Sequence, residues 1–123
     1  MNITILGAGA YGLALANILS DKNDVTVYSI IEKEINYLKN TYRNDKLFPN
    51  IQLSKKICFT NNIDEAINNT NLIIIAIPTN YIEDTIKLLK NKINNNIHIC
   101  IASKGINDDT NKFAYDIVKE ILK

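Results

Sequence analysis

The sequence predicts an α/β fold with a doubly wound, mainly parallel sheet that carries helices on both faces. Short β-branched runs alternate with longer amphipathic segments, as strands and crossover helices do. A glycine-rich turn joins the first strand to the first helix. Residues 72–77 are continuously apolar, which is typical of a strand covered on both faces. Because 123 residues suffice for one domain, we expect a single domain over residues 1–123.

Strands and helices alternate regularly in the first part of the chain. Apolar side chains recur at helical spacing between Ala10 and Ser20, and again at Ile35, Leu38 and Tyr42. Helical crossovers of this kind are right-handed and join parallel strands. We expect a strand over Ile3–Leu6, a helix over Ala10–Ser20, a strand over Val25–Tyr28 and a helix over Glu32–Tyr42.

The later elements are bounded by proline and asparagine. Pro49 lies in a loop, Pro78 ends the long apolar run, and Asn61 or Asn62 caps a short helix. We expect a loop over Asp45–Ser54, strands over Ile57–Phe59, Leu72–Ile77 and Ile97–Ala102, and helices over Asp64–Asn68, Tyr81–Lys92 and Asn111–Leu122.

The charge and composition of the chain limit the classes of partner that we expect. The formal net charge is +1 and the acidic and basic residues are interspersed, so we expect neither nucleic acid nor a membrane surface as a partner. No apolar run approaches the roughly 20 residues of a membrane span. Residues 1–6 lack the basic start of a secretory signal, which favours a cytoplasmic location.

The two cysteines also favour a cytoplasmic location. Cys58 and Cys100 are far apart in the sequence, and each lies inside an apolar run. This pattern favours buried, reduced thiols over a redox pair or metal ligands. We therefore expect no metal site.

The stretch from Gly7 to Gly12 follows the pattern G-x-G-x-x-G between a strand and a helix, the phosphate-binding turn of Rossmann-type dinucleotide-binding domains. Gly7 permits the tight turn, Gly9 leaves room for a pyrophosphate, and Gly12 lets the helix lie close to the strand. The anion would rest on free N–H groups at the helix start. The alternatives are a turn without a ligand, or a flavin or another nucleotide in the same turn.

The residues after the second strand bear on the choice between NAD and NADP. An acidic residue there binds the ribose hydroxyls, whereas an arginine receives the 2′-phosphate of NADP. The stretch 28–33 contains no arginine, and Glu32 follows Gly12 by twenty positions, close to the expected spacing. Glu32 is explained equally well as a carboxylate that stabilises the first turn of a helix through the helix dipole and binds no ligand. Ile30 would cover one face of the adenine.

Four stretches of the chain resemble a single enzyme family. They are Ile5–Ala16, Leu47–Leu53, Ile75–Thr79 and Ala102–Ile106. Together they resemble the N-terminal cofactor domain of the NAD(P)-dependent glycerol-3-phosphate dehydrogenases, in order and over nearly the whole chain. The Leu-Phe-Pro and Ser-Lys-Gly segments within them make the resemblance specific, because neither has a general role in Rossmann domains.

The resemblance implies reduction of dihydroxyacetone phosphate to sn-glycerol 3-phosphate, or the reverse, with NAD or NADP as cofactor. These metabolites connect carbohydrate metabolism with phospholipid biosynthesis. Ala10 and Tyr11 would contact the pyrophosphate through their backbone, while Pro78 and Tyr81 would lie beside the nicotinamide. Lys104 would bind both cofactor and substrate. NADP-preferring members commonly carry an arginine where this chain has Ile30, so the resemblance favours NAD or a relaxed preference.

Lys104 is also a candidate from its position alone. It follows the strand expected over Ile97–Ala102, and the carboxyl ends of the strands line the ligand crevice of an open α/β sheet. A cation there can hold a phosphate or polarise a carbonyl group. A lysine that is merely exposed after a strand is the alternative.

The family enzymes continue into a helical domain that supplies the catalytic lysine, whereas this chain ends at Lys123. We therefore expect no catalytic residue in this chain, a small-molecule substrate, and a partner that is either a separate C-terminal catalytic segment or a second copy in a homodimer. The rival interpretation is a stand-alone dinucleotide-binding or sensing module without turnover. A different dehydrogenase that shares the domain is disfavoured by the Ser-Lys-Gly segment.

Overall fold

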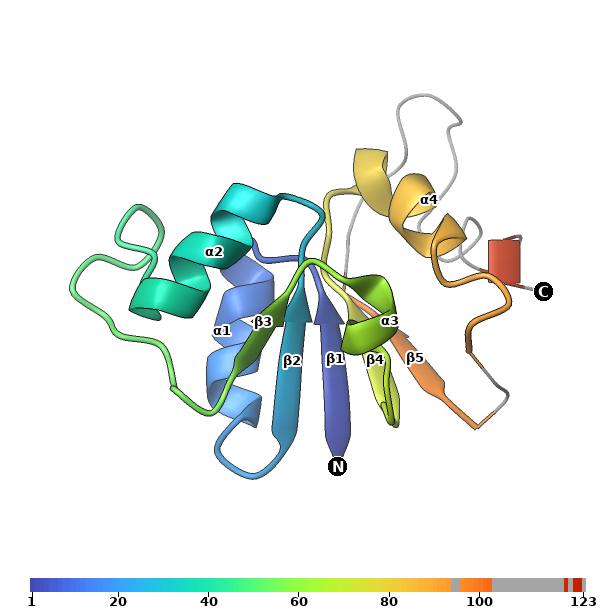
Figure 1. Ribbon diagram of the computed structural model, residues 1–123, viewed down its shortest axis with the longest axis horizontal. Helices are drawn as coiled ribbons and strands as arrows, with labels where there is room; N and C mark the ends of the chain where they lie inside the picture. Colours follow the sequence, from blue (N-terminus) through green and yellow to red (C-terminus); the bar gives the residue numbers. More distant parts are fainter. Residues whose placement is uncertain (94–95, 103–118, 120, 123) are drawn as a thin grey trace.

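The sheet predicted from the sequence is present in the computed structural model, which describes residues 1–93, 96–102, 119 and 121–122 (Figure 1). Within these residues the strands are β1 (Asn2–Leu6), β2 (Asp24–Tyr28), β3 (Cys58–Thr60), β4 (Leu72–Ile75) and β5 (His98–Ile101). They pair in parallel in the order β3-β2-β1-β4-β5. This is the strand order of a doubly wound sheet, with its reversal point beside β1.

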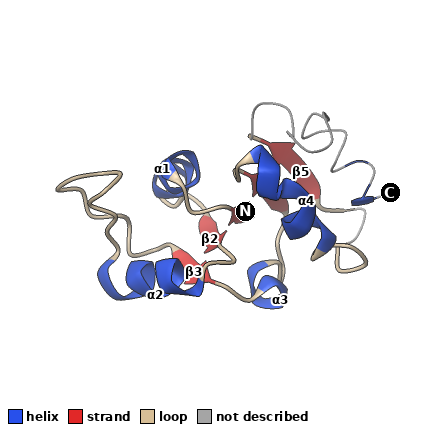
Figure 2. Cartoon of the chain, turned by 90° about the horizontal axis from the view of Figure 1, so that it is seen from above, coloured by secondary structure: helices blue, strands red, loops and turns tan. Residues whose placement is uncertain are grey.

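Helices cover both faces of the sheet. They are α1 (Ala10–Leu19), α2 (Glu32–Thr41), α3 (Ile63–Ala66) and α4 (Thr79–Lys87) within the described residues. Side chains of α1 and α2 share one core cluster with Ile5 and Val27, while α3 and α4 share the other with Leu6. Seen from above, α1 and α2 accordingly lie on one side of the sheet and α3 on the other (Figure 2). The prediction of helices on both faces is confirmed.

The apolar run that predicted a doubly covered strand forms the middle of the molecule. Ile74 of β4 belongs to the cluster beneath α1, whereas Ile73 and Ile75 face α4. All three side chains are buried. Because successive side chains of a strand point to opposite faces, a strand between two helical layers needs apolar residues at every position.

Helix α4 is displaced from its expected bounds of Tyr81–Lys92. It begins at Thr79, because Pro78 has the extended conformation of a helix cap and its carbonyl accepts the N–H of Tyr81 at 2.9 Å. It ends at Lys87, where the N–H of Leu88 bonds to the carbonyl of Thr85, three residues back. Such tighter bonds mark the last turn of a helix. The earlier start brings Tyr81 into the first turn, beside the end of β4.

The structure shows which asparagine caps helix α3. The side chain of Asn62 accepts the N–H of Glu65 at 3.1 Å, so Asn62 and not Asn61 is the cap. The helix covers Ile63–Ala66 and is shorter than the expected Asp64–Asn68. Asn69 follows in a left-handed conformation, which turns the chain toward β4.

The expected loop over Asp45–Ser54 is confirmed. The N–H of Leu53 donates to the carbonyl of Tyr42 at 2.7 Å, and Arg43 forms a single antiparallel bridge with Gln52. The Leu-Phe-Pro segment therefore lies in a loop that returns to the end of α2. In Figure 1 this loop lies at the left of the molecule.

The expectation that both thiols are buried is wrong. Cys58 and Cys100 are free, and both are exposed. They lie on β3 and β5, the outer strands of the described sheet. An apolar run shows that a segment is a strand, but the burial of its two faces depends on the strand order.

The helix expected over Asn111–Leu122 lies largely outside the described residues. Within the described part of the chain, no helix has both the length and the apolar character that crossing a membrane requires.

Candidate functional site

A cleft of about 360 Å³ opens at the carboxyl ends of β1, β2 and β4. It lies at the point where the strand order reverses, the usual ligand position in an open α/β sheet. The turn after β1 forms its floor, and the segments leading into α2 and α4 form its walls. Its lining residues are Gly7, Ala8, Gly9, Tyr28, Ser29, Ile30, Ile31, Glu34, Ala76, Ile77, Pro78, Tyr81 and Thr85.

Gly7 fits the turn only because it lacks a side chain. Its φ of +121° lies in a region that L side chains rarely adopt, and a Cβ there would overlap the carbonyl oxygen of Ala76. Its N–H donates to the carbonyl of Tyr28 at 2.8 Å. Gly7 is therefore held between the ends of β2 and β4, as the tight turn predicted for this position requires.

Gly12 lets α1 approach β1. A Cβ at this position would overlap the carbonyl oxygen of Gly7 and lie 3.5 Å from a methyl carbon of Ile5. Gly12 itself is buried. The close helix–strand packing predicted for the third glycine is confirmed.

Gly9 differs from both, because no contact with the described residues requires a glycine there. Its φ is −80°, which any residue adopts, and a Cβ built on it meets no heavy atom of the described residues within 4 Å. The residue is exposed and lines the cleft. The fold thus leaves open space at this glycine, where the motif predicts room for a pyrophosphate.

The start of α1 carries no negative charge of its own. Gly9 caps the helix without a side-chain hydrogen bond, and its first turn contains no acidic residue. The N–H groups at a helix start carry partial positive charge and favour an anion. Ala10 and Tyr11 begin the helix and are exposed at the edge of the cleft floor, although they do not line the cleft itself.

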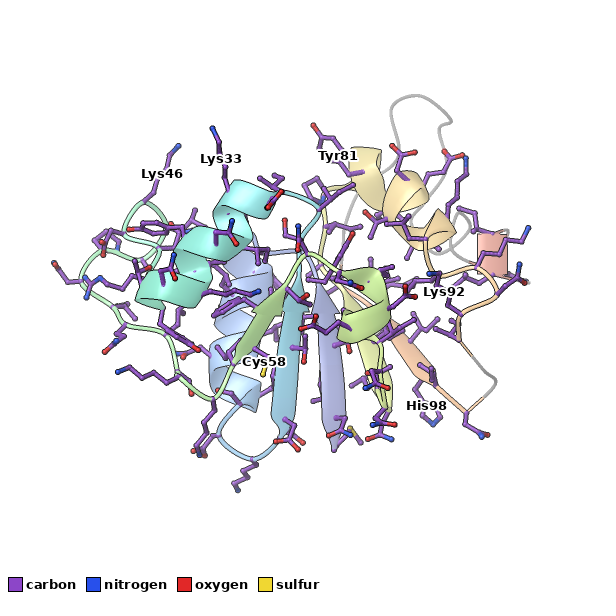
Figure 3. All side chains as sticks on the ribbon, viewed as in Figure 1. Lys33, Lys46, Cys58, Tyr81, Lys92 and His98 are labelled. Carbon is purple, nitrogen blue, oxygen red and sulfur yellow. The ribbon has the colours of Figure 1, made fainter. Side chains whose placement is uncertain are left out.

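The two ends of the cleft present exposed apolar side chains. Ile30 is 65% exposed at the end near β2, and Tyr81 is 64% exposed at the end near β4, beside Pro78. Figure 3 shows Tyr81 at the start of α4, extending beyond the carboxyl ends of the strands. Planar rings such as adenine and nicotinamide suit surfaces of this kind.

Glu34 is a cleft residue that the sequence analysis missed. It lies in the first turn of α2 and lines the cleft, whereas Glu32 is exposed and is not among the lining residues. Burial raises the pKa of the Glu34 carboxyl above its ordinary value. No spacing along the chain identified Glu34, because its place in the cleft wall depends on how α2 is rotated about its axis.

The predicted site residues therefore fall into three groups. Gly7, Gly9, Ile30, Pro78 and Tyr81 line the cleft, and Ala10, Tyr11 and Gly12 form the start of α1 beneath it. Lys104 lies outside the described residues. Among the residues that the structure does describe, no cluster of His, Cys, Asp and Glu could hold a metal ion.

Comparisons with known proteins show the family to which this chain is similar. A family model described as the N-terminus of NAD-dependent glycerol-3-phosphate dehydrogenase matches residues 2–123. The chain is 37% identical over 122 residues to a glycerol-3-phosphate dehydrogenase (NAD(P)+) of Brachyspira hyodysenteriae, and 38% identical over 125 residues to one of Fusobacterium nucleatum. These alignments cover 99% and 100% of this chain but 37% of each relative.

A solved structure shows the same fold. The crystal structure of glycerol-3-phosphate dehydrogenase from Coxiella burnetii superposes with a TM-score of 0.89 at 23% identity, over 98% of this chain and 37% of that one. Both kinds of comparison thus align this chain with little more than a third of a longer protein.

Proposed function

Since the chain belongs to the family of the NAD-dependent glycerol-3-phosphate dehydrogenase N-terminus, we propose that residues 1–123 form a dinucleotide-binding domain that holds NAD or NADP in the cleft. The observation that carries this proposal is the open space at Gly9. Gly7 and Gly12 are required by the packing of the protein, whereas no described residue occupies the space at Gly9, which a bound ligand would fill.

The residues present fit a dinucleotide along the length of the cleft. The diphosphate would rest on backbone N–H groups of Gly9, Ala10 and Tyr11, where the helix start favours negative charge. The adenosine half would lie toward Ile30 and the nicotinamide half toward Pro78 and Tyr81. When bound, the nicotinamide accepts or donates a hydride, and the protein positions it for that transfer.

The reaction that we propose for the whole protein is that of glycerol-3-phosphate dehydrogenase. Bound NADH or NADPH would supply a hydride to the carbonyl carbon of dihydroxyacetone phosphate, and a proton would join the carbonyl oxygen, which would give sn-glycerol 3-phosphate and the oxidised cofactor. Lys104 would hold the substrate phosphate or polarise its carbonyl group. We propose that the proton-transferring group comes from a separate C-terminal segment, that the alternative partner is a second copy in a homodimer, and that the protein acts in the cytoplasm.

Calorimetric titration with NADH tests the binding proposal. We expect weak binding, with a Kd on the order of 0.1–1 mM. Gly9→Val should abolish it by filling the open space, while the melting temperature changes little. Ile18→Val, on the exposed side of α1, is the matched control and should bind like the unaltered chain. The proposal fails if Gly9→Val binds NADH normally, or if the unaltered chain gives no binding heat.

A turnover assay separates this proposal from a stand-alone sensing module. With dihydroxyacetone phosphate present, the chain alone should leave NADH unoxidised. Adding the part of the Brachyspira hyodysenteriae relative that lies beyond the matched region should restore oxidation, because that part would supply the proton-transferring group. Rapid oxidation by the chain alone would contradict the division of roles, and the absence of any restoration would favour the sensing module.

A further inference from the structure

Glu34 lies where the cleft passes from the glycine turn to α2. The hydrogen bond from Gly7 to the carbonyl of Tyr28 places the end of β2 directly beside that turn. The chain then enters α2 through Ile31, whose N–H donates to the hydroxyl of Ser29 at 3.2 Å. Glu34 follows in the first helical turn and lines the cleft together with Ser29, Ile30 and Ile31.

This carboxyl has no protein partner in the described part of the chain. No hydrogen bond or ion pair involves it there, and none of the described residues that line the cleft is a lysine or an arginine. Burial raises the pKa of Glu34 without any opposing contribution from a nearby cation. Lys33, its neighbour in sequence, is exposed and extends outward from α2 (Figure 3).

A carboxylate near the start of a helix can stabilise that helix by interacting with the helix dipole, without binding a ligand. In α2 that role is available to Glu32, which occupies the same first turn and is exposed. The dipole gives no reason for a second carboxylate that is partly buried against the cleft. A ligand hydroxyl supplies one, because it would donate a hydrogen bond to the unpaired oxygens.

We propose that Glu34 is the residue that makes this cleft prefer NAD to NADP. The proposal rests on the proposed function, because it presumes a dinucleotide whose adenosine half lies toward Ile30. There the carboxylate accepts hydrogen bonds from the ribose hydroxyls of NAD. The 2′-phosphate of NADP places negative charge against the same carboxylate, with no cation among the described lining residues to receive it. Glu34 is thus a specificity-determining residue.

The test compares NADH and NADPH titrations of the full 123-residue chain with those of two neutral, nearly isosteric variants. The unaltered chain should bind NADH at least about tenfold more tightly than NADPH, since a hydrogen bond to a charged group is lost and a repulsion is gained. Glu34→Gln should weaken NADH binding and strengthen NADPH binding, so that the ratio falls about tenfold. Glu32→Gln removes the same charge from the same helical turn outside the cleft, and it should keep the ratio of the unaltered chain.

Each other outcome overturns the proposal in a distinguishable way. If both cofactors bind and Glu34→Gln leaves the ratio unchanged, or if the unaltered chain prefers NADPH, the role of Glu34 is wrong while the proposed function stands. If Glu32→Gln changes the ratio as much as Glu34→Gln does, net charge and not position is responsible. If neither cofactor binds the unaltered chain, the proposed function fails and this inference fails with it. Melting curves of both variants show that they are folded.

Discussion

The glycines after β1 are required for separate reasons, and substitutions can distinguish these reasons. Alanine at Gly12 pushes its Cβ into the carbonyl oxygen of Gly7, so α1 must move away from β1. We expect Gly12→Ala to lower the free energy of unfolding by about 1–3 kcal/mol, as overpacking of a close contact does. Urea denaturation measures this change. Gly9→Ala is the control and should stay within about 0.5 kcal/mol, because its Cβ meets no heavy atom within 4 Å. Equal losses in both variants would contradict the assignment.

The partly buried carboxyl of Glu34 predicts a dependence of stability on pH. Burial raises its pKa in the folded chain above the ordinary value of 4.5, so folding favours the protonated form. Its contribution to stability is therefore complete below the unfolded-state pKa and is lost as the pH rises through the folded-state pKa. Glu34→Gln should be more stable than the unaltered chain at neutral pH and equally stable at about pH 4. Thermal melts of the two proteins across this range test the prediction. A constant difference in stability at every pH would contradict it.

At the residue scale, the sequence predicted the roles of Gly7 and Gly12 but did not identify Glu34 as the acidic residue of the cleft. The roles of Gly7 and Gly12 follow from local geometry that the motif itself encodes. The choice between Glu32 and Glu34 depends on how α2 is rotated about its axis, and a spacing counted along the chain does not contain that rotation. Burial of Ile35 and Leu38 sets it, and it brings Glu34 against the cleft.

At the element scale, the cap of α3 provides a sharp test. The side chain of Asn62 accepts the N–H of Glu65, whereas Asn61 precedes the cap and makes no such bond. Asn62→Ala should lower the free energy of unfolding by about 1 kcal/mol, the usual value for a lost helix cap. Asn61→Ala should change it much less. The reverse order in chemical denaturation would contradict the observed helix start.

The outer strands predict the reactivity of both thiols. Cys58 and Cys100 are exposed and free, so both should react with a maleimide or a disulfide reagent in the native chain. We expect two modified thiols per chain by mass spectrometry without denaturant. A thiol that reacts only in denaturant would contradict its exposure. The sequence misjudged these residues because the edge position of β3 and β5 is set by strand order, which is a non-local property.

At the scale of the whole molecule, the sequence predicted the fold class and most elements correctly. Alternating strand and helix patterns are local, and right-handed crossovers then restrict the strand orders that can form. The cleft is different, because its walls come from segments after β1, β2 and β4 that are far apart in the sequence. The motif and the resemblance pointed to Gly9, Ile30 and Tyr81 separately, and only the structure brings them to one cavity.

We propose that the turn after β1 binds a dinucleotide through the backbone where α1 begins. Mapping of amide chemical shifts by heteronuclear NMR during an NADH titration tests it most directly. We expect the largest shifts at Gly9, Ala10 and Tyr11, with smaller ones around Ile30 and Tyr81, and we expect Gly9→Val to remove them. Shifts confined to the amino ends of the strands, near Asp24, or the absence of shifts at the turn, would contradict this proposal.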